Sequence, residues 1–318
     1  MILKLNSTGP LVIDLQNFLK LKADGVFGPD TEKAVKKWQS DNGLVADGVV
    51  GPKTWEAMGL ATTDVSEKRN QPMSPSTIPF NIIQHFLPKG QYYEGPTKKR
   101  WIYLHHTAGW ESPYSTIAGW AADNRGAVAT EFVLGGPSIL GNNDKFDGVL
   151  VQCFPEGGYG WHLGTGNDAM HRESVGIEVC NFGPVTKGGY FKWDIASKRN
   201  VWIKLKSESF YTYVGTEANP SQIIELDSEF RGFKYWHKYS DKQVQVLKDW
   251  IIYIGNRDNI DIRKGIVEQI HKHGIEAFNK VDIALCNKTP GVWLHTNVQA
   301  GKVDLFPQPE IVEMLLSL

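Results

Sequence analysis

Residues 101–109, WIYLHHTAG, are the stretch from which the fold of most of this chain follows. Apolar and aromatic residues lead directly into two histidines, and Gly109 ends the run, a pattern typical of a short buried strand. Side chains alternate between the two faces of a strand, so His105 and His106 are expected on opposite faces. His105 ends the strand and can project from the rigid rim of a sheet.

Further segments with strand-like composition follow this one, at residues 130–134, 148–154 and 174–179. Helical patterns come later in the chain. Ser240-Asp-Lys-Gln243 has the form of a capping box and opens a helix with one apolar side. A second helix is predicted over residues 266–273, stopped by Gly274. This mixture predicts an α/β domain over residues 81–318, with a mixed β-sheet flanked by helices.

The first sixty residues are organised around an internal repeat. The octapeptide DGVFGPDT at residues 24–31 recurs as DGVVGPKT at residues 47–54. Each copy combines an Asp-Gly turn with a Gly-Pro step that suits the start of a helix. Apolar residues at helical spacing lie before, between and after the copies. Residues 1–60 are therefore predicted to form a small all-α domain of three helices.

Length and composition agree with two domains. A chain of 318 residues suits one small and one medium domain. Residues 61–80, ATTDVSEKRNQPMSPSTIPF, are polar, rich in Ser, Thr and Pro, and without periodicity, which predicts a linker.

Composition also excludes several classes of function. A net charge of −1 argues against a nucleic-acid binder. No apolar run reaches the roughly 18 residues of a membrane span, and the N-terminus lacks the pattern of an export signal. The cysteines are odd in number and far apart, so we expect buried free thiols: Cys153, Cys180 and Cys286. Eleven tryptophans and eleven tyrosines suit a carbohydrate surface, although large cores use them too.

Candidate metal ligands gather near the C-terminus. His295, Lys302 and Asp304 lie within ten residues, after a short apolar segment. Together with His105 they offer two imidazoles and one carboxylate, the ligand number that a catalytic zinc takes while its fourth position holds water. The remaining histidines, apart from His106, are more typical of surface or structural positions: His85, His162, His171, His237, His271 and His273.

The repeat region resembles the peptidoglycan-binding domain 1 family. The resemblance rests on both octapeptides, on Ala34-Val-x-x-Trp38-Gln39 and on Gly43-Leu44, and it covers residues 1–60. It implies a non-catalytic module that holds the bacterial wall polymer. The Gly, Pro and Thr residues of the repeat are expected mainly to shape turns and helix caps.

The second domain resembles the zinc-dependent N-acetylmuramoyl-L-alanine amidases of the amidase type 2 group. The match covers roughly residues 98–182 and 233–309. It is carried, in family order, by YLHHTAG at 103–109, QCFP at 152–155, WHLG at 161–164, SVGIE at 174–178 and the segment 295–304.

This resemblance assigns a role to each candidate residue. His105, His295 and Asp304 become the ligands of one zinc ion, which makes the pKa of a bound water fall toward neutrality. Glu178 becomes the general base, and Lys302 the cation that stabilises the oxyanion.

Two choices follow from the same resemblance. It favours His105 over His106 as the ligand, which leaves His106 as a neighbour of the ligands or a packing residue. It favours Glu178 over Glu131, a rival acid on another expected strand. The residues expected beside the substrate are His106, Thr107, Trp161 and His162.

The chain departs from the family pattern in two places. Many relatives have proline directly after the third ligand, whereas Leu305 and Phe306 intervene here before Pro307. The stretch 183–232 is an insertion whose aromatic residues suggest a hairpin or flap. Such a flap widens the substrate groove or covers a sheet edge, and we favour the second interpretation.

The sequence thus predicts a monomeric peptidoglycan hydrolase that cleaves the amide between N-acetylmuramic acid and L-alanine. A wall-binding module without an export signal suggests a phage endolysin, made in the host cytoplasm and acting on the wall after release. A bacterial autolysin is the nearest alternative, and an intracellular recycling amidase fits poorly. A non-catalytic peptidoglycan-binding protein is the alternative from another functional class.

Overall fold

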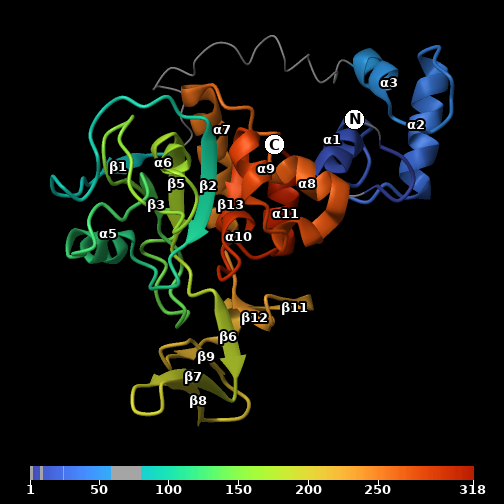
Figure 1. The fold of residues 1–318 in the computed structure, drawn as a ribbon. Helices are drawn as coiled ribbons and strands as arrows, with labels where there is room; N and C mark the ends of the chain where they lie inside the picture. The colour runs from blue at the N-terminus through green and yellow to red at the C-terminus, as the bar shows by residue number, and fades with distance from the viewer. Residues whose placement is uncertain (1–2, 8–9, 24, 59–79) are drawn as a thin grey trace. The chain divides into compact units, whose positions relative to one another are not determined.

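The computed structural model describes residues 3–7, 10–23, 25–58 and 80–318. The chain divides into two compact units, Met1–Gln71 and Pro72–Leu318, drawn in Figure 1. Apart from Phe80, the predicted linker lies outside the described residues. The two units are described separately below.

The described residues of the N-terminal unit form three helices, as predicted: α1 (Pro10–Phe18), α2 (Pro29–Asp41) and α3 (Pro52–Ala57). A buried glutamine organises each copy of the repeat. Gln39 accepts a hydrogen bond from the backbone N–H of Gly48 (2.9 Å) and donates to Thr54 Oγ1 (3.2 Å). Gln16 makes the same two bonds to the equivalent glycine and threonine of the first copy. The repeated Gly and Thr therefore close the loops internally, as a turn-shaping role requires.

The C-terminal unit is built on a six-stranded sheet in the order β1-β4-β3-β5-β2-β13. Only the β3–β4 pair is antiparallel, so the predicted mixed sheet is confirmed. The strands are β1 (Ile82–Gln84), β2 (Trp101–His106), β3 (Phe132–Leu134), β4 (Leu150–Gln152), β5 (Ser174–Val179) and β13 (Gly291–Leu294).

Helices cover both faces of this sheet. The elements are α5 (Pro113–Ala121), α6 (Asp168–Arg172), α7 (Asp241–Asp258), α8 (Ile266–His273), η3 (Gly274–Phe278), α9 (Ile283–Lys288), α10 (His295–Val298) and α11 (Pro309–Leu316). Apolar residues of α7, α8 and α11 pack with Ile102 and Leu104 of β2 in the largest core. The opposite face packs against α5, α6 and α9.

Two predicted helix boundaries are confirmed. The capping box of Ser240 and Gln243 is present at the start of α7. Helix α8 ends at His273, and Gly274 follows with φ 60°, a backbone conformation in which glycine avoids the steric cost of a side chain.

The insertion forms a separate layer of strands. Its elements are β6 (Pro184–Lys187), β7 (Gly189–Asp194), β8 (Arg199–Lys204), β9 (Phe210–Tyr211), β10 (Glu217–Ala218), η2 (Pro220–Gln222), β11 (Ile223–Phe230) and β12 (Phe233–His237). The predicted hairpin is confirmed as the β7–β8 pair, and the other strands form a sheet in the order β10-β9-β6-β12-β11.

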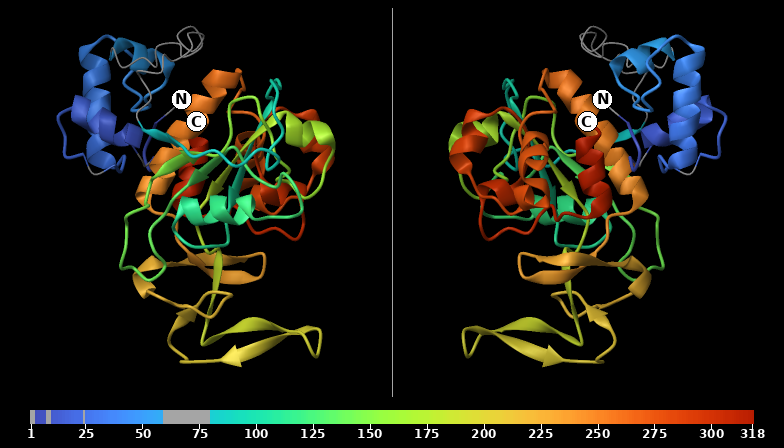
Figure 2. Two further views of the ribbon diagram at one scale, coloured as in Figure 1. Left: turned by 90° about the vertical axis from the view of Figure 1, so that its left-hand side faces the viewer. Right: turned by 90° about the vertical axis from the view of Figure 1, so that its right-hand side faces the viewer.

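The prediction that the insertion covers a sheet edge is wrong. The edge strands of the main sheet are β1 and β13, and neither pairs with an insertion strand. The insertion instead leaves the end of central strand β5, and it lies beyond the carboxyl ends of β2 and β5 in Figures 1 and 2. Its sheet also runs to His237, past the expected limit at 232, because β12 pairs with β6.

The three cysteines are buried and free, as predicted. Within the described residues, no helix combines the length and the apolar character needed to cross a membrane.

Candidate active site

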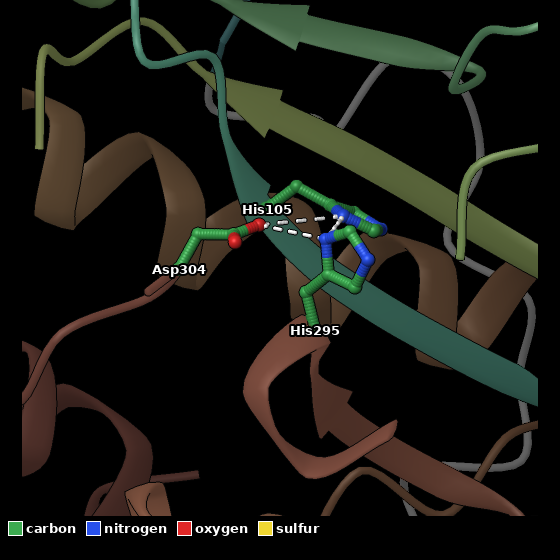
Figure 3. A group of neighbouring side chains, drawn as sticks. All are labelled: His105, His295 and Asp304. Atoms are coloured by element: carbon green, nitrogen blue, oxygen red, sulfur yellow. Dashed lines mark hydrogen bonds and ion pairs between the residues drawn. The ribbon is translucent and has the colours of Figure 1, made fainter. Parts of the chain in front are cut away.

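Three buried side chains from distant parts of the chain meet at the carboxyl end of the main sheet (Figure 3). His105 belongs to the end of β2, and His295 is the first residue of α10, directly after β13. Because β2 and β13 pair in parallel, the two histidines leave the same end of the sheet side by side. Their Nδ1 atoms are 2.8 Å apart, and Asp304 Oδ2 lies 3.0 Å from that of His295 and 3.5 Å from that of His105.

Asp304 is held in place by the two residues that interrupt the family pattern. Leu305 and Phe306 are fully buried. The ring of Phe306 stacks on Trp236 at 4.5 Å and on Tyr239 at 4.7 Å. This departure from the family pattern therefore anchors the loop beside Asp304 instead of loosening it.

A hydrogen bond on the side of the His295 ring away from His105 and Asp304 determines which ring nitrogen carries the proton. Its Nε2 lies 3.0 Å from the carbonyl oxygen of Leu163, which can only accept, so Nε2 carries the proton. In the neutral ring, Nδ1 then presents a lone pair toward His105 and Asp304.

A relay of hydrogen bonds fixes His105 in the same way. Ser174 Oγ donates to the carbonyl oxygen of His171 (3.2 Å), so it must accept from His162 Nε2 (2.8 Å). His162 Nδ1 is therefore an acceptor, and the N–H of His105 Nε2 donates a hydrogen bond to it (2.9 Å). The Nδ1 atom of His105 is left with a lone pair, also directed at the centre.

The centre therefore combines two imidazole lone pairs with a carboxylate. Burial, with the neighbouring His295, lowers the pKa of His105 to about 4, so its ring is neutral near pH 7. Three acceptors at this spacing suit a cation between them, because a cation relieves the repulsion between their lone pairs.

The donor set fits a divalent zinc ion. Tetrahedral zinc with nitrogen and oxygen ligands at about 2.0–2.2 Å brings ligand atoms to roughly 3.3 Å from one another. The three separations here, 2.8, 3.0 and 3.5 Å, lie around that value. The outer hydrogen bonds to both imidazoles are those that orient histidine ligands in zinc sites.

Glu178 lies beside this centre on the same face of the sheet. It is the register partner of His105 in the parallel β2–β5 pair. Its Oε2 atom is buried and has no hydrogen-bond partner among the described residues. Burial raises the pKa of Glu178 well above its usual value; Asp304 raises it further and Lys302 opposes the rise. A carboxyl group in this setting can accept a proton and hold it.

Glu178, His295 and Asp304 line one cleft of about 730 Å³, whereas His105 is fully buried. The four residues expected beside the substrate line it, together with Glu178 and Lys302: His106, Thr107, Trp161 and His162. All four already have internal partners. The Trp161 indole N–H donates to the Tyr93 hydroxyl (3.1 Å), and the Thr107 hydroxyl accepts from the backbone N–H of Asn181 (3.3 Å). His106 Nδ1 lies 2.8 Å from the Tyr239 hydroxyl, and both ring nitrogens of His162 are used by the relay.

Comparison with known families agrees with this geometry. A family model described as N-acetylmuramoyl-L-alanine amidase matches residues 95–291, more than half of the chain. The chain belongs to the N-acetylmuramoyl-L-alanine amidase family. The matched range contains His105 and Glu178 of the amidase, whereas His295 and Asp304 lie just beyond it. A second family model, for a peptidoglycan binding domain, matches residues 8–58, so both predicted family resemblances are confirmed.

Solved structures of related proteins match parts of the amidase chain. A Burkholderia AP3 phage endolysin is 38% identical over 20% of this chain and 26% of its own, with a TM-score of 0.18. A mutant endolysin from Bacillus subtilis is 26% identical over 31% of this chain and 60% of its own, with a TM-score of 0.24. PlyL is 13% identical over 70% of this chain and 86% of its own, with a TM-score of 0.37. No curated protein matches the chain.

The rival acid Glu131 has a different environment in the amidase. It is buried and paired with Arg257 at 2.8 Å, and it accepts a hydrogen bond from Gln152 at 3.1 Å. It does not line the cleft that contains Glu178.

Replacing Glu131 with glutamine should therefore act on stability. Removing Glu131 from this buried ion pair leaves Asp258, 2.8 Å away, as the remaining carboxylate partner of Arg257. The expected cost is about 3 kcal/mol in the free energy of unfolding, the lower end of the range for a broken buried pair. Urea denaturation measures the loss. Glu94→Gln is the matched control, because Glu94 pairs with Lys89 at the surface and should change stability by less than about 1 kcal/mol. Equal stability of Glu131→Gln and wild type would contradict this assignment.

The relay behind His105 was not predicted from the sequence. Ser174 was recognised only as part of a strand, and His162 was placed beside the substrate. Nothing in the local pattern shows that their side chains meet, because the contact depends on how the segment before α6 folds back over β5.

Proposed function

We propose that this chain hydrolyses the amide bond between the lactyl group of N-acetylmuramic acid and the L-alanine of the peptidoglycan stem, with a zinc ion held by His105, His295 and Asp304. One observation carries the proposal. Two imidazoles, each with its outer nitrogen protonated, direct lone pairs at a buried carboxylate, and the unpartnered oxygen of Glu178 lies in the same cleft.

Each polar residue of the cleft has a separate role in the proposed reaction. A zinc ion at this site would supply Lewis-acid chemistry, polarising the scissile carbonyl and activating water near neutral pH. Glu178 takes the proton of the attacking water and delivers it to the leaving nitrogen of L-alanine. Lys302, which lines the same cleft, stabilises the negative charge that develops on the carbonyl oxygen.

The other lining residues bind and position. Thr107 and Trp161 contribute a hydroxyl and an aromatic face to the cleft wall, which suits contact with a sugar or with the first residues of the stem. His162 acts on His105 and leaves no ring nitrogen for the substrate. It is therefore a positioning residue in this proposal.

The N-terminal module supplies attachment to the polymer. Its match to a peptidoglycan binding domain supports peptidoglycan as the common partner of both units. Tethering raises the local concentration of the catalytic unit at an insoluble substrate. We further propose the lytic role of a phage endolysin, since an enzyme that must open an intact wall benefits from such a module.

Digestion of purified sacculi tests the reaction. Mass spectrometry should detect free stem peptides that begin with L-alanine, together with glycan strands that retain intact N-acetylmuramic acid. New reducing sugar ends, or peptides cut within the stem, would instead indicate a glycosidase or an endopeptidase. Binding to sacculi without any soluble product would favour a recognition protein.

The relay makes a separate prediction about metal affinity. Ser174→Ala removes the acceptor for the His162 Nε2 proton, so His162 can rotate and release His105. Loss of such outer contacts typically weakens metal binding by about 10- to 100-fold. Competition between the full chain and a chromogenic chelator measures the zinc dissociation constant independently of activity. His273→Ala, at an exposed histidine on α8, is the control. An unchanged zinc dissociation constant for Ser174→Ala would show that the relay does not support metal binding.

A further inference from the structure

Two large aromatic rings remain exposed next to the cleft. Trp110 is 44% exposed and lies in the loop that follows β2, while Tyr213 is 56% exposed and belongs to the insertion. We call these two residues the aromatic rim. Exposed rings need a reason, because burying them would contribute a large apolar area to the core.

The rim is held firmly at its base. The Tyr213 hydroxyl donates a hydrogen bond to the carbonyl oxygen of Ala108 at 2.9 Å. Buried Phe182 packs edge-on against Trp110 at 5.0 Å and also contacts Tyr213 at 6.4 Å. Both rings are therefore fixed underneath while their outer surfaces face solvent, which lowers the entropy cost of binding a ligand there.

The same loop forms part of the cleft wall. Thr107 and Ala108 line the cleft and lead directly to Trp110. Backbone hydrogen bonds join this loop to the end of β5 and to the segment after it, from Thr107 N–H to the Val179 carbonyl (3.0 Å) and from Gly109 N–H to the Asn181 carbonyl (3.1 Å). Ala108 adopts φ 47°, an uncommon conformation for a residue with a side chain, and its carbonyl is the one that Tyr213 binds. The rim is thus joined to the cleft wall through Ala108, and neither of its rings lines the cleft itself.

We infer that the aromatic rim binds a sugar of the glycan strand next to the N-acetylmuramic acid whose amide is cleaved, so that the insertion extends the substrate site along the glycan. This inference rests on the proposed function. Flat aromatic faces suit the C–H surface of a pyranose ring, whose hydroxyl groups stay in water. Stem peptides carry free carboxylates, and neither rim ring offers the cation that would recognise them.

A second copy of the chain is a poorer occupant for the same surface. A stable protein interface buries about 800 Å² on each partner, and two rings provide only a fraction of that area.

Substrate length provides the test. Initial rates of the full chain are measured on uncleaved glycan oligomers that carry stems and on N-acetylmuramoyl-peptide without a neighbouring sugar. Trp110→Ala and Tyr213→Ala should raise KM for the oligomers on the order of 10-fold, as expected for loss of one aromatic contact. Both variants should leave the kinetics on the short substrate unchanged. Trp193→Ala is the matched control: Trp193 is 57% exposed but lies on the β7–β8 hairpin, and neither substrate should respond.

The outcomes separate this inference from the proposed function. Equal losses on both substrates, no loss on either, or the same loss from Trp193→Ala would each overturn the rim as a sugar subsite. Failure of the wild type to cleave any substrate would instead contradict the proposed function. In that case, binding of peptide-free glycan strands by full-length wild type and Tyr213→Ala, which carry the same N-terminal module, still tests the rim: equal affinity overturns it, and weaker binding by the variant supports it.

Discussion

Glu178→Gln is expected to lower the rate constant for release of stem peptides by about 10²- to 10⁴-fold, the range typical for loss of a general base. Glutamine keeps nearly the same shape but cannot accept the proton of water. Because Glu178 lies beside the proposed ligands and is not one of them, zinc content and thermal stability should stay close to wild type. Steady-state kinetics on sacculi, metal analysis and thermal denaturation measure these three quantities.

Glu156→Gln provides the comparison for this change. Glu156 is exposed and lies outside the cleft, so the same chemical substitution there should leave kcat unaltered. If Glu178→Gln kept most of the activity, another group would have to be the base. If it lost zinc as well as activity, Glu178 would belong among the metal ligands and its assigned role would need revision.

Removal of the metal is expected to abolish hydrolysis. His295→Ala leaves one imidazole and one carboxylate, too few protein ligands for a stable catalytic zinc, so the purified variant should contain almost no metal. Incubation of the wild type with a strong chelator should have the same effect, reversed by zinc. Both the His295→Ala variant and the chelator-treated wild type are tested by measuring hydrolysis of sacculi and metal content on the same samples.

His106→Ala is the informative control for metal content. His106 is adjacent to His105 but points to the other face of β2, where its Nδ1 atom meets the Tyr239 hydroxyl. This variant should retain about one zinc per chain. Loss of metal from His106→Ala but not from His105→Ala would reverse the choice between the two histidines.

Local sequence patterns were sufficient for the elements that carry the site. The prediction of a strand over residues 174–179 has the bounds of β5, and Gly274 ends α8 as expected. Alternation along residues 101–106 also placed His105 and His106 on different faces, because a strand has a fixed two-residue period. These features depend only on neighbouring residues.

Features that depend on contacts between distant segments could not be predicted from local sequence patterns. The loop of Asp304 is fixed by Phe306, which stacks on Trp236 from the far end of the insertion. The insertion was expected at a sheet edge, yet β6 pairs with β12 and builds a sheet of its own at the end of β5. Such pairings are decided by packing between segments about 50 residues apart, for which one sequence contains no register signal.

The central claim is that two imidazoles and one carboxylate hold a single zinc ion in this cleft. Anomalous X-ray scattering on either side of the zinc absorption edge, from crystals of the full chain grown without added metal, measures this directly. The account predicts one strong peak per chain, bounded by His105 Nδ1, His295 Nδ1 and the Asp304 carboxylate. Absence of a peak there, or zinc bound at some other group of residues, would contradict it.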